Sequence, residues 1–252
     1  MEESFISPDQ EPIEICLLAG KIMLQSGAET YRVEDTMTRL ADVLGLTGSQ
    51  SYVTPTGIVF QSGEMKWAKL IRIVERTTDL EKVAAVNDIS RKLSSGDISQ
   101  DKAHRLLIQI DTTRHAYPIW LQIIAAALAS GCFTYMFLGG PEDFIPGIIC
   151  GGLGFVTFLW LHRLVKVKFF AEFTASLIIG IVAHLLVKVG LGYALDKIII
   201  GSVMPLVPGL LITNAVRDLM AGHLVSGLSR GAEAFLTAFA IGAGIAVVFT
   251  VI

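Results

Sequence analysis

The chain has 252 residues, of which 52% are hydrophobic and 17% are charged. Soluble domains contain roughly 45–50% apolar and about 25% charged residues, so this composition indicates an extensive membrane-embedded part. The net charge of −3 and the lack of a basic stripe argue against nucleic acid as a partner. Because most charged residues lie before position 118, the sequence predicts two domains, residues 1–115 and residues 116–252.

The first part, residues 1–115, has the composition of an ordinary soluble domain. Its beginning is acidic and lacks the basic stretch and apolar core of a signal peptide, so we expect this domain to stay in the cytosol. Apolar residues within 11–25 predict a mostly buried helix. A capping box, with Ser26 as N-cap and Glu29 reaching back, predicts a second helix that runs to about Leu44.

The pattern then changes to short runs of β-branched and aromatic residues. Residues 51–54, 57–61 and 67–74 are separated by proline and glycine, which predicts three strands. Capping residues within 78–81 and at Ser99 predict two more helices. The expected fold of the first part is therefore a small α+β domain.

The start of the second helix carries a dense polar group, Glu29, Thr30, Arg32 and Glu34. This group is a candidate acid–base site, although a solvated helix face with ion pairs is the more ordinary interpretation. The chain has no Walker loop, no dinucleotide-binding glycine motif, no serine-centred nucleophile elbow and no metal-type spacing of histidines or cysteines. We therefore expect no metal, no cofactor and no enzymatic activity. A membrane-anchored, hydrolase-like enzyme in residues 1–115 is the alternative.

Residues 116–252 are expected to form the membrane domain. About 20 apolar residues in a helix span the hydrocarbon core of a bilayer. The sequence predicts about five such helices, over residues 118–138, 145–164, 169–190, 198–216 and 232–252. The whole chain is thus expected to be an α-helical multi-pass membrane protein with an N-terminal soluble α+β domain.

Loop charges predict the orientation of these spans. The second loop carries Arg163, Lys166 and Lys168, and the fourth carries Arg217 and Arg230. Short basic loops face the cytoplasm, so we expect the N-terminal domain in the cytosol and the C-terminus outside, in the plasma or inner membrane. Arg230 is interpreted as an anchor at the cytoplasmic membrane surface.

The fourth span contains two prolines and a glycine in its middle. Proline removes a backbone donor and clashes with the preceding turn, so this helix is expected to break. Inside a bilayer, freed backbone groups are tolerated only where protein or a wet cavity satisfies them, which makes a broken span a candidate substrate site. The expected site comprises the break and the polar residues after it: Pro205, Pro208, Gly209, Asn214, Arg217 and Asp218.

Two ionisable residues, Glu172 and His184, lie within the third predicted span. A charge at membrane depth costs about 2.5–3.5 kcal/mol on insertion scales, so each such residue needs a partner or a role. Glu172 and His184 are candidates for ion coupling or gating. The structural alternatives are snorkelling for Glu172 and a hydrogen bond between helices for His184.

Several of these motifs together resemble the threonine/serine exporter family. The resemblance lies in Ser26-Gly-Ala-Glu-Thr-Tyr-Arg-Val-Glu34, Pro205-Leu-Val-Pro-Gly209 and Asn214-Ala-Val-Arg-Asp218, and extends from about Cys16 to the end of the chain. It implies export of small amino acids such as threonine and serine, or of small carboxylates such as succinate, driven by an ion gradient.

The resemblance also implies a partner. Full-length members of that family join two membrane halves, whereas this sequence holds one half with its cytosolic domain. The expected assembly is a split transporter in which a small hydrophobic membrane subunit supplies the other half, or in which a second copy of this chain does so. A non-transporting assembly or sensor subunit is the remaining hypothesis.

Overall fold

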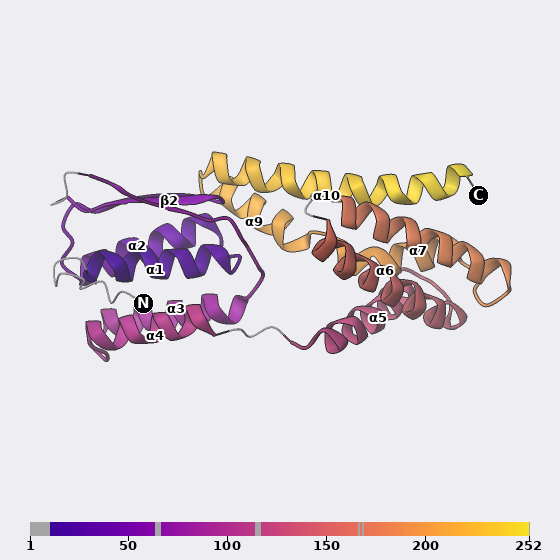
Figure 1. Cartoon of the computed structure of the whole chain (residues 1–252), viewed down its shortest axis with the longest axis horizontal. Helices are drawn as coiled ribbons and strands as arrows, with labels where there is room; N and C mark the ends of the chain where they lie inside the picture. The colour runs from indigo at the N-terminus through magenta and orange to yellow at the C-terminus, as the bar shows by residue number, and fades with distance from the viewer. Residues whose placement is uncertain (1–10, 64–66, 114–116, 166, 168, 252) are drawn as a thin grey trace. The chain divides into compact units, whose positions relative to one another are not determined.

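The computed structural model describes residues 11–63, 67–113, 117–165, 167 and 169–251. Its contacts divide the chain into two compact units, which contain the helices and strands labelled in Figure 1. The first unit comprises residues 1–115 and 212–231, and the second comprises residues 116–211 and 232–252. The predicted domain boundary at 115 and the loop residues Lys166 and Lys168 lie outside the described residues.

The first unit holds the helices and strands that the sequence predicts for its first part. Its strands form one antiparallel sheet in the order β1-β2-β3, with Tyr52 opposite Val59 and Val59 opposite Leu70. The sheet packs along one side of the α1–α2 pair, and α3 and α4 pack along the other (Figure 1). The elements are α1 (Glu11–Gln25), α2 (Thr30–Val43), β1 (Gln50–Thr54), β2 (Gly57–Gln61), β3 (Lys69–Arg72), α3 (Leu80–Ser94) and α4 (Gln100–Thr112).

Apolar residues at helical spacing build the core of the first unit. Val33, Met37 and Leu40 recur on one face of α2 and are buried, as the sequence predicts. They join Ile15 of α1 and Phe60 of β2 in one apolar cluster. The sheet therefore buries one face against the helix pair, and its other face carries exposed side chains.

Two helix starts differ from the predicted ones, and a third agrees. α2 begins at Thr30, Glu29 occupies its N-cap position without a side-chain cap, and the predicted capping box from Ser26 is wrong. In α3 the cap is Asp79, which accepts a hydrogen bond from the backbone amide of Lys82. Ser99 caps α4 as predicted.

Two helices, α9 and α10, each contribute to both units. The first unit takes residues 212–220 of α9 (Gly209–Met220) and residues 224–231 of α10 (Leu224–Val251). α10 has 28 residues. At about 1.5 Å per residue it is about 42 Å long, whereas the hydrocarbon core measures roughly 30 Å. α10 is thus longer than an untilted helix needs to cross a bilayer, and it begins at Leu224, not near residue 232 as predicted.

The second unit consists of apolar helices. In the described residues, four helices are long and apolar enough to cross a membrane, or up to five if the interrupted pair around Pro205–Gly209 counts as one span. The predicted multi-pass helical membrane protein is thus confirmed. The unit contains α5 (Ile119–Met136), η1 (Pro141–Asp143), α6 (Phe144–Leu164), α7 (Phe170–Lys188), α8 (Leu195–Val203), η2 (Met204–Leu206) and the remainder of α10.

Small residues let these helices approach one another closely. A Cβ atom added at Gly201 of α8 would lie 2.2 Å from the Thr134 hydroxyl of α5, and one at Gly151 of α6 would lie 2.0 Å from the Ser130 hydroxyl. Without a hydrophobic driving force inside lipid, such close packing is a main source of helix association. These glycines therefore serve packing.

The buried carboxylate of Asp143 ties two loops of the second unit together. It accepts hydrogen bonds from the backbone amides of Tyr193 at 2.7 Å and Ala194 at 3.2 Å. The loop between α5 and α6 and the loop between α7 and α8 therefore lie at the same end of this helix bundle. This agrees with the expectation for consecutive membrane-spanning helices, in which every second loop lies on the same side of the membrane.

Candidate functional site

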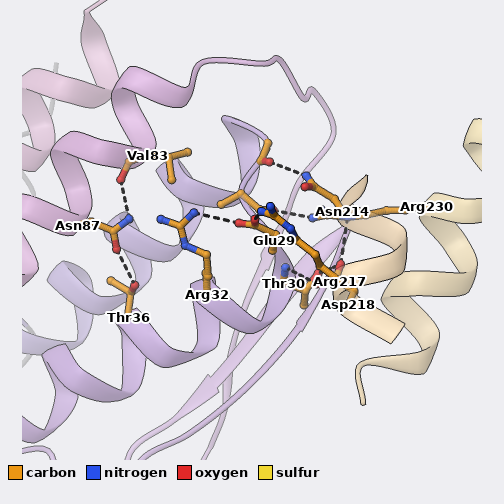
Figure 2. A network of polar contacts seen from close by, with 12 residues as sticks. Glu29, Thr30, Arg32, Thr36, Val83, Asn87, Asn214, Arg217, Asp218 and Arg230 are labelled. Atoms are coloured by element: carbon orange, nitrogen blue, oxygen red, sulfur yellow. Dashed lines mark hydrogen bonds and ion pairs between the residues drawn. The ribbon is translucent and has the colours of Figure 1, made fainter. Parts of the chain in front are cut away.

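A network of polar side chains, most of them buried, joins the start of α2 to α9 and α10 within the first unit (Figure 2). On α9, Asn214, Arg217 and Asp218 stand three and four residues apart, so they share one face of the helix. That face meets the turn and first residues of α2. Two motifs about 190 residues apart in the sequence thus form one site.

Asp218 caps α2 from another helix. Its Oδ1 accepts a hydrogen bond of 2.9 Å from the backbone amide of Thr30, and its Oδ2 accepts one of 3.0 Å from the Thr30 hydroxyl. Both residues are completely buried. The first amides of a helix have no partner within the helix, and the helix dipole favours a negative charge there. Asp218 supplies both the acceptor and the charge.

Arg230 closes the buried end of the network. Its Nη2 donates to the carbonyl of Ala28 at 2.8 Å, and its Nε lies 3.5 Å from Oδ2 of Asp218. Arg230 is 4% exposed, so the predicted role as an anchor at the membrane surface is wrong. A buried charge requires a charged or hydrogen-bonded partner, and Asp218 and Ala28 provide both.

Glu29 lies between two arginines. Its Oε1 accepts from Nη1 of Arg217 at 2.5 Å, and its Oε2 accepts from Nη1 of Arg32 at 3.1 Å. Burial of Glu29 raises the pKa of its carboxyl, but a backbone hydrogen bond and the two guanidinium groups outweigh this effect, so the pKa lies below its usual value. Because both oxygens are engaged in this way, Glu29 does not reach back to form a capping box.

The side chains of Arg217 and Arg32 form the solvent-exposed part of the network. Their side chains are 55% exposed for Arg217 and 39% exposed for Arg32, whereas Glu29 is 6% exposed. A guanidinium group has five donors in a planar fork that matches a carboxylate. The exposed side of the network is therefore cationic, next to the buried carboxylate of Glu29.

Asn214 and Gly27 complete the contact between the two motifs. The side-chain amide of Asn214 donates to the carbonyl of Gly27 at 2.9 Å. Gly27 has a φ of +89°, a conformation that glycine adopts without the steric cost that other residues meet. This turn directs the Gly27 carbonyl toward α9, so the glycine has a role in forming the network.

Glu34, the remaining predicted residue of the cytosolic polar group, belongs to a different set of contacts. Its Oε1 accepts from the backbone amide of Val53 at 2.8 Å, and its Oε2 lies 3.8 Å from Nδ1 of His223. Ser226 donates to the carbonyl of Val53 at 3.3 Å. These contacts connect α2, β1, the turn that holds His223 and the first turn of α10.

The other predicted site residues do not join this network. Pro205 lies in η2, and Pro208 immediately precedes Gly209, the first residue of α9, so regular helix is interrupted at these residues. Glu172 and His184 lie half-buried on α7 in the second unit. At about 1.5 Å per residue they are about 18 Å apart along the helix axis, too far to act as one site.

The sequence interpretation missed Arg230, Gly27, Ala28 and His223 as members of these contacts. A signal was present for Arg230, because buried Asp218 needs a cation and Arg217 points about 100° away from it on the helix. Ala28 and Gly27 take part through their backbone carbonyls, which every residue has, so the sequence does not mark these contacts.

Comparison with known proteins identifies the family of this chain. The chain is 26% identical over 244 residues to the "Probable succinate transporter subunit YjjP" of Klebsiella aerogenes, a match that covers 94% of this chain and 92% of that protein. It is 25% identical over 237 residues to the "Probable threonine/serine exporter" of Mycobacterium tuberculosis, covering 90% of this chain and 44% of that protein. No solved structure matches the chain significantly. The family model described as "Putative threonine/serine exporter" matches residues 14–252. The chain therefore belongs to the threonine/serine exporter family.

Proposed function

We propose that this chain is the larger subunit of a secondary transporter that exports small amino acids such as threonine and serine, or small carboxylates such as succinate. That the chain is part of a membrane transporter follows from its family and from its apolar helices. The proposal extends it to the direction, the substrate class and an ion gradient as the driving force. The names of the two relatives support these substrates.

The observation that carries the proposal is the ion pair between Arg217 and Glu29, with the Arg217 side chain 55% exposed. All of the proposed substrates carry a carboxylate. A substrate carboxylate that approaches Arg217 meets a guanidinium group with donors to spare and competes with Glu29 for it. Arg32 keeps Glu29 paired during this exchange, so the buried carboxylate does not lose all of its cationic partners.

The interrupted helix supports a path through the membrane part. α9 begins at Gly209, directly after Pro208, so its first amides point toward the break and favour a negative charge there. Arg217 follows Gly209 by about 12 Å along the same helix. We propose that Pro205, Pro208 and Gly209 form one wall of the path and that Arg217 receives the carboxylate at its cytosolic mouth.

The proposed assembly contains a second polypeptide. The relative from Mycobacterium tuberculosis is matched over 44% of its length, whereas the relative from Klebsiella aerogenes, named a subunit, is matched over 92%. We propose that a small hydrophobic membrane subunit supplies the rest of the path and that Glu172 and His184 contribute to ion coupling. A second copy of this chain is the alternative partner. Purifying the complex and identifying its polypeptides distinguishes the two arrangements.

Efflux measurements test this function. Cells that lack the endogenous transporter and produce this chain with the proposed small membrane subunit are loaded with labelled threonine, serine or succinate. Arg217→Ala should reduce efflux of at least one substrate tenfold or more at equal protein level, while Arg217→Lys should retain part of it. Arg39→Ala is the matched control, since Arg39 forms an exposed ion pair with Asp35 on α2. Efflux of all three substrates that does not depend on this chain would refute the proposal.

A further inference from the structure

The two edges of the three-stranded sheet differ in how their backbone groups are satisfied. At the edge formed by β1, the amide of Val53 donates to Oε1 of Glu34 at 2.8 Å, and its carbonyl accepts from the Ser226 hydroxyl at 3.3 Å. Side chains of α2 and α10 therefore cover the middle of that edge. β3 forms the other edge, and an uncovered edge strand is a template on which a further strand can form.

The strand register shows which backbone groups of β3 face away from the sheet. The amide of Ile73 donates to the carbonyl of Thr56 at 2.9 Å, so these two residues form a pair of the hydrogen-bonded type. Hydrogen-bonded and non-hydrogen-bonded pairs alternate along antiparallel strands, so Ile71 also bonds to β2. The amides and carbonyls of Leu70 and Arg72 consequently point outward. Among the described residues, none bonds to them.

An apolar groove of about 530 Å³ adjoins this outward-facing edge, between β3, α1 and α4. Residues of β3 line the groove whereas no residue of β2 does, which places it on the free side of β3. Its apolar lining consists of Leu17, Leu18, Leu70, Ile71 and Ile108. A strand added next to β3 would direct every second side chain toward this lining. The edge and the groove together have the two features of β-strand addition, which are main-chain hydrogen bonds for affinity and pockets for alternate side chains for specificity.

Two cations on β3 decide what kind of strand fits this edge. Lys69 and Arg72 have no carboxylate partner in the part of the chain that the structure describes, and Lys69 instead lies 5.9 Å from the ring centre of Trp67. Opposite charges on neighbouring strands stabilise the pairing, and like charges destabilise it. A second copy of β3 would bring the same two cations to the seam. The charge of the edge therefore favours an acidic strand from another polypeptide.

We propose that β3 and the groove bind an extended, acidic segment of a partner polypeptide, which adds a fourth strand to the sheet. The backbone of the segment exchanges hydrogen bonds with the amides and carbonyls of Leu70 and Arg72. Apolar side chains at every second position of the segment cover Leu18 and Ile108, and acidic side chains at the intervening positions pair with Arg72 and lie near Lys69. The site shares no residue with the polar network around Glu29, so it is separate from the proposed transport path.

Peptide binding to the purified full-length chain in detergent tests the ligand class. The probe is the synthetic peptide acetyl-Glu-Ile-Glu-Val-Glu-Ile-amide, labelled with fluorescein and followed by fluorescence anisotropy. We expect saturable binding, and binding at least tenfold weaker for the peptide in which lysine replaces each glutamate. No binding of the acidic peptide at concentrations up to about 1 mM would overturn the proposal.

Methylation of the peptide backbone distinguishes strand addition from apolar adhesion. One derivative carries N-methyl groups on its three glutamates, and the other carries them on its three apolar residues. The amides of successive residues in a strand point to opposite sides, so only one of the two sets faces β3. One derivative should therefore retain binding, and the other should bind at least tenfold more weakly. Equal affinities of the two derivatives would contradict an added strand.

Substitutions then test the location. Leu70→Pro removes one outward-facing amide but no bond to β2, and it should raise the dissociation constant of the acidic peptide tenfold or more. Ser51→Pro is the matched control, because the same alternation places its amide at the opposite edge of the sheet. Ile108→Glu puts a negative charge into the groove and should also weaken binding tenfold, whereas Leu80→Glu on α3 lies outside the groove and should not. Thermal unfolding without peptide verifies that each variant is folded. Equal affinity in all four variants would refute the site.

Two further results would assign the edge to a different occupant. A dimer of the chain in light scattering that Leu70→Pro abolishes would show that a second copy fills the edge. Peptide binding that appears only after deletion of residues 2–10 would show that the chain itself occupies the groove. Either result would overturn the proposal of a separate partner.

Discussion

Thr30 and Asp218, 188 positions apart in the sequence, are joined by two hydrogen bonds, from the backbone amide and the hydroxyl of Thr30 to the two carboxylate oxygens. One side chain of α9 thus satisfies the amino end of α2. The same carboxylate lies 3.5 Å from Arg230 of α10. Three helices that are distant in the sequence meet at one buried charge.

Asp218→Ala should destabilise the protein by about 3–5 kcal/mol, because it leaves Arg230 and the amide of Thr30 without their acceptor in a buried place. The thermal unfolding midpoint of the purified protein measures this change. Asp35→Ala is the control: Asp35 forms an exposed ion pair with Arg39, and its loss should cost less than about 1 kcal/mol. Equal shifts for the two variants would contradict a buried capping role for Asp218.

A double-mutant cycle should detect the pair between Glu29 and Arg217. We expect a coupling energy of about 1 kcal/mol between Glu29→Gln and Arg217→Met, since solvent screens the half-exposed arginine. Arg32 limits the loss, because it still pairs with Glu29 when Arg217 is replaced. Unfolding of the four proteins provides the energies, and additivity within about 0.3 kcal/mol would show that the pair is not formed in solution.

The stability that Glu29 contributes should depend on pH in one direction. The pKa of its carboxyl is lowered from 4.5, by its backbone hydrogen bond and two guanidinium groups acting against burial, so the ionised form is favoured in the folded protein. The contribution is present above the unfolded pKa and is lost as the pH falls through the folded pKa. The difference in unfolding midpoint between wild type and Glu29→Gln should therefore be constant from about pH 8 to pH 6 and shrink below about pH 4.5. A difference that grows on acidification would have the wrong sign.

Gly27→Ala should destabilise the first unit by about 1–2 kcal/mol, because a side chain at a φ of +89° is strained. The strain would also displace the carbonyl that accepts from Asn214. Gly231→Ala serves as the control, since its added Cβ would lie 3.9 Å from the nearest atom, an ordinary contact. Thermal unfolding compares the two, and a neutral Gly27→Ala would show that the turn relaxes without cost.

Gly201→Ala should disrupt the contact between α8 and α5, because the new Cβ would lie 2.4 Å from the backbone nitrogen of Thr134, which cannot move independently of its helix. Overpacking of this kind typically costs about 1–3 kcal/mol. At Gly242 of α10 the structure has no described atom within 4 Å of an added Cβ, so Gly242→Ala should be tolerated. The fraction of monodisperse protein after extraction and its unfolding midpoint report both outcomes.

The amino-acid sequence is enough to predict the helices and strands of the first unit and the apolar helices of the second. Periodic burial of Val33, Met37 and Leu40 marks α2, and Ser99 marks the start of α4, because these signals act within one or two turns of the chain. The apolar helices of the second unit can also be recognised from continuous stretches of sequence, because the bilayer thickness sets the number of apolar residues that a spanning helix needs. Most polar residues of the network were also singled out from the sequence, although as two separate groups.

That these two groups form one network is visible only in the folded chain. Sequence spacing placed Ser26 and Glu29 in a capping box, whereas Arg217 and Arg32 bind Glu29 and Asp218 caps α2 in its place. Sequence charge placed Arg230 at a membrane surface, whereas its side chain is buried against Ala28 and Asp218. The local sequence pattern shows which side chains are polar. The partner of a buried charge comes from a segment that is distant in the sequence, and the two meet only once the chain has folded.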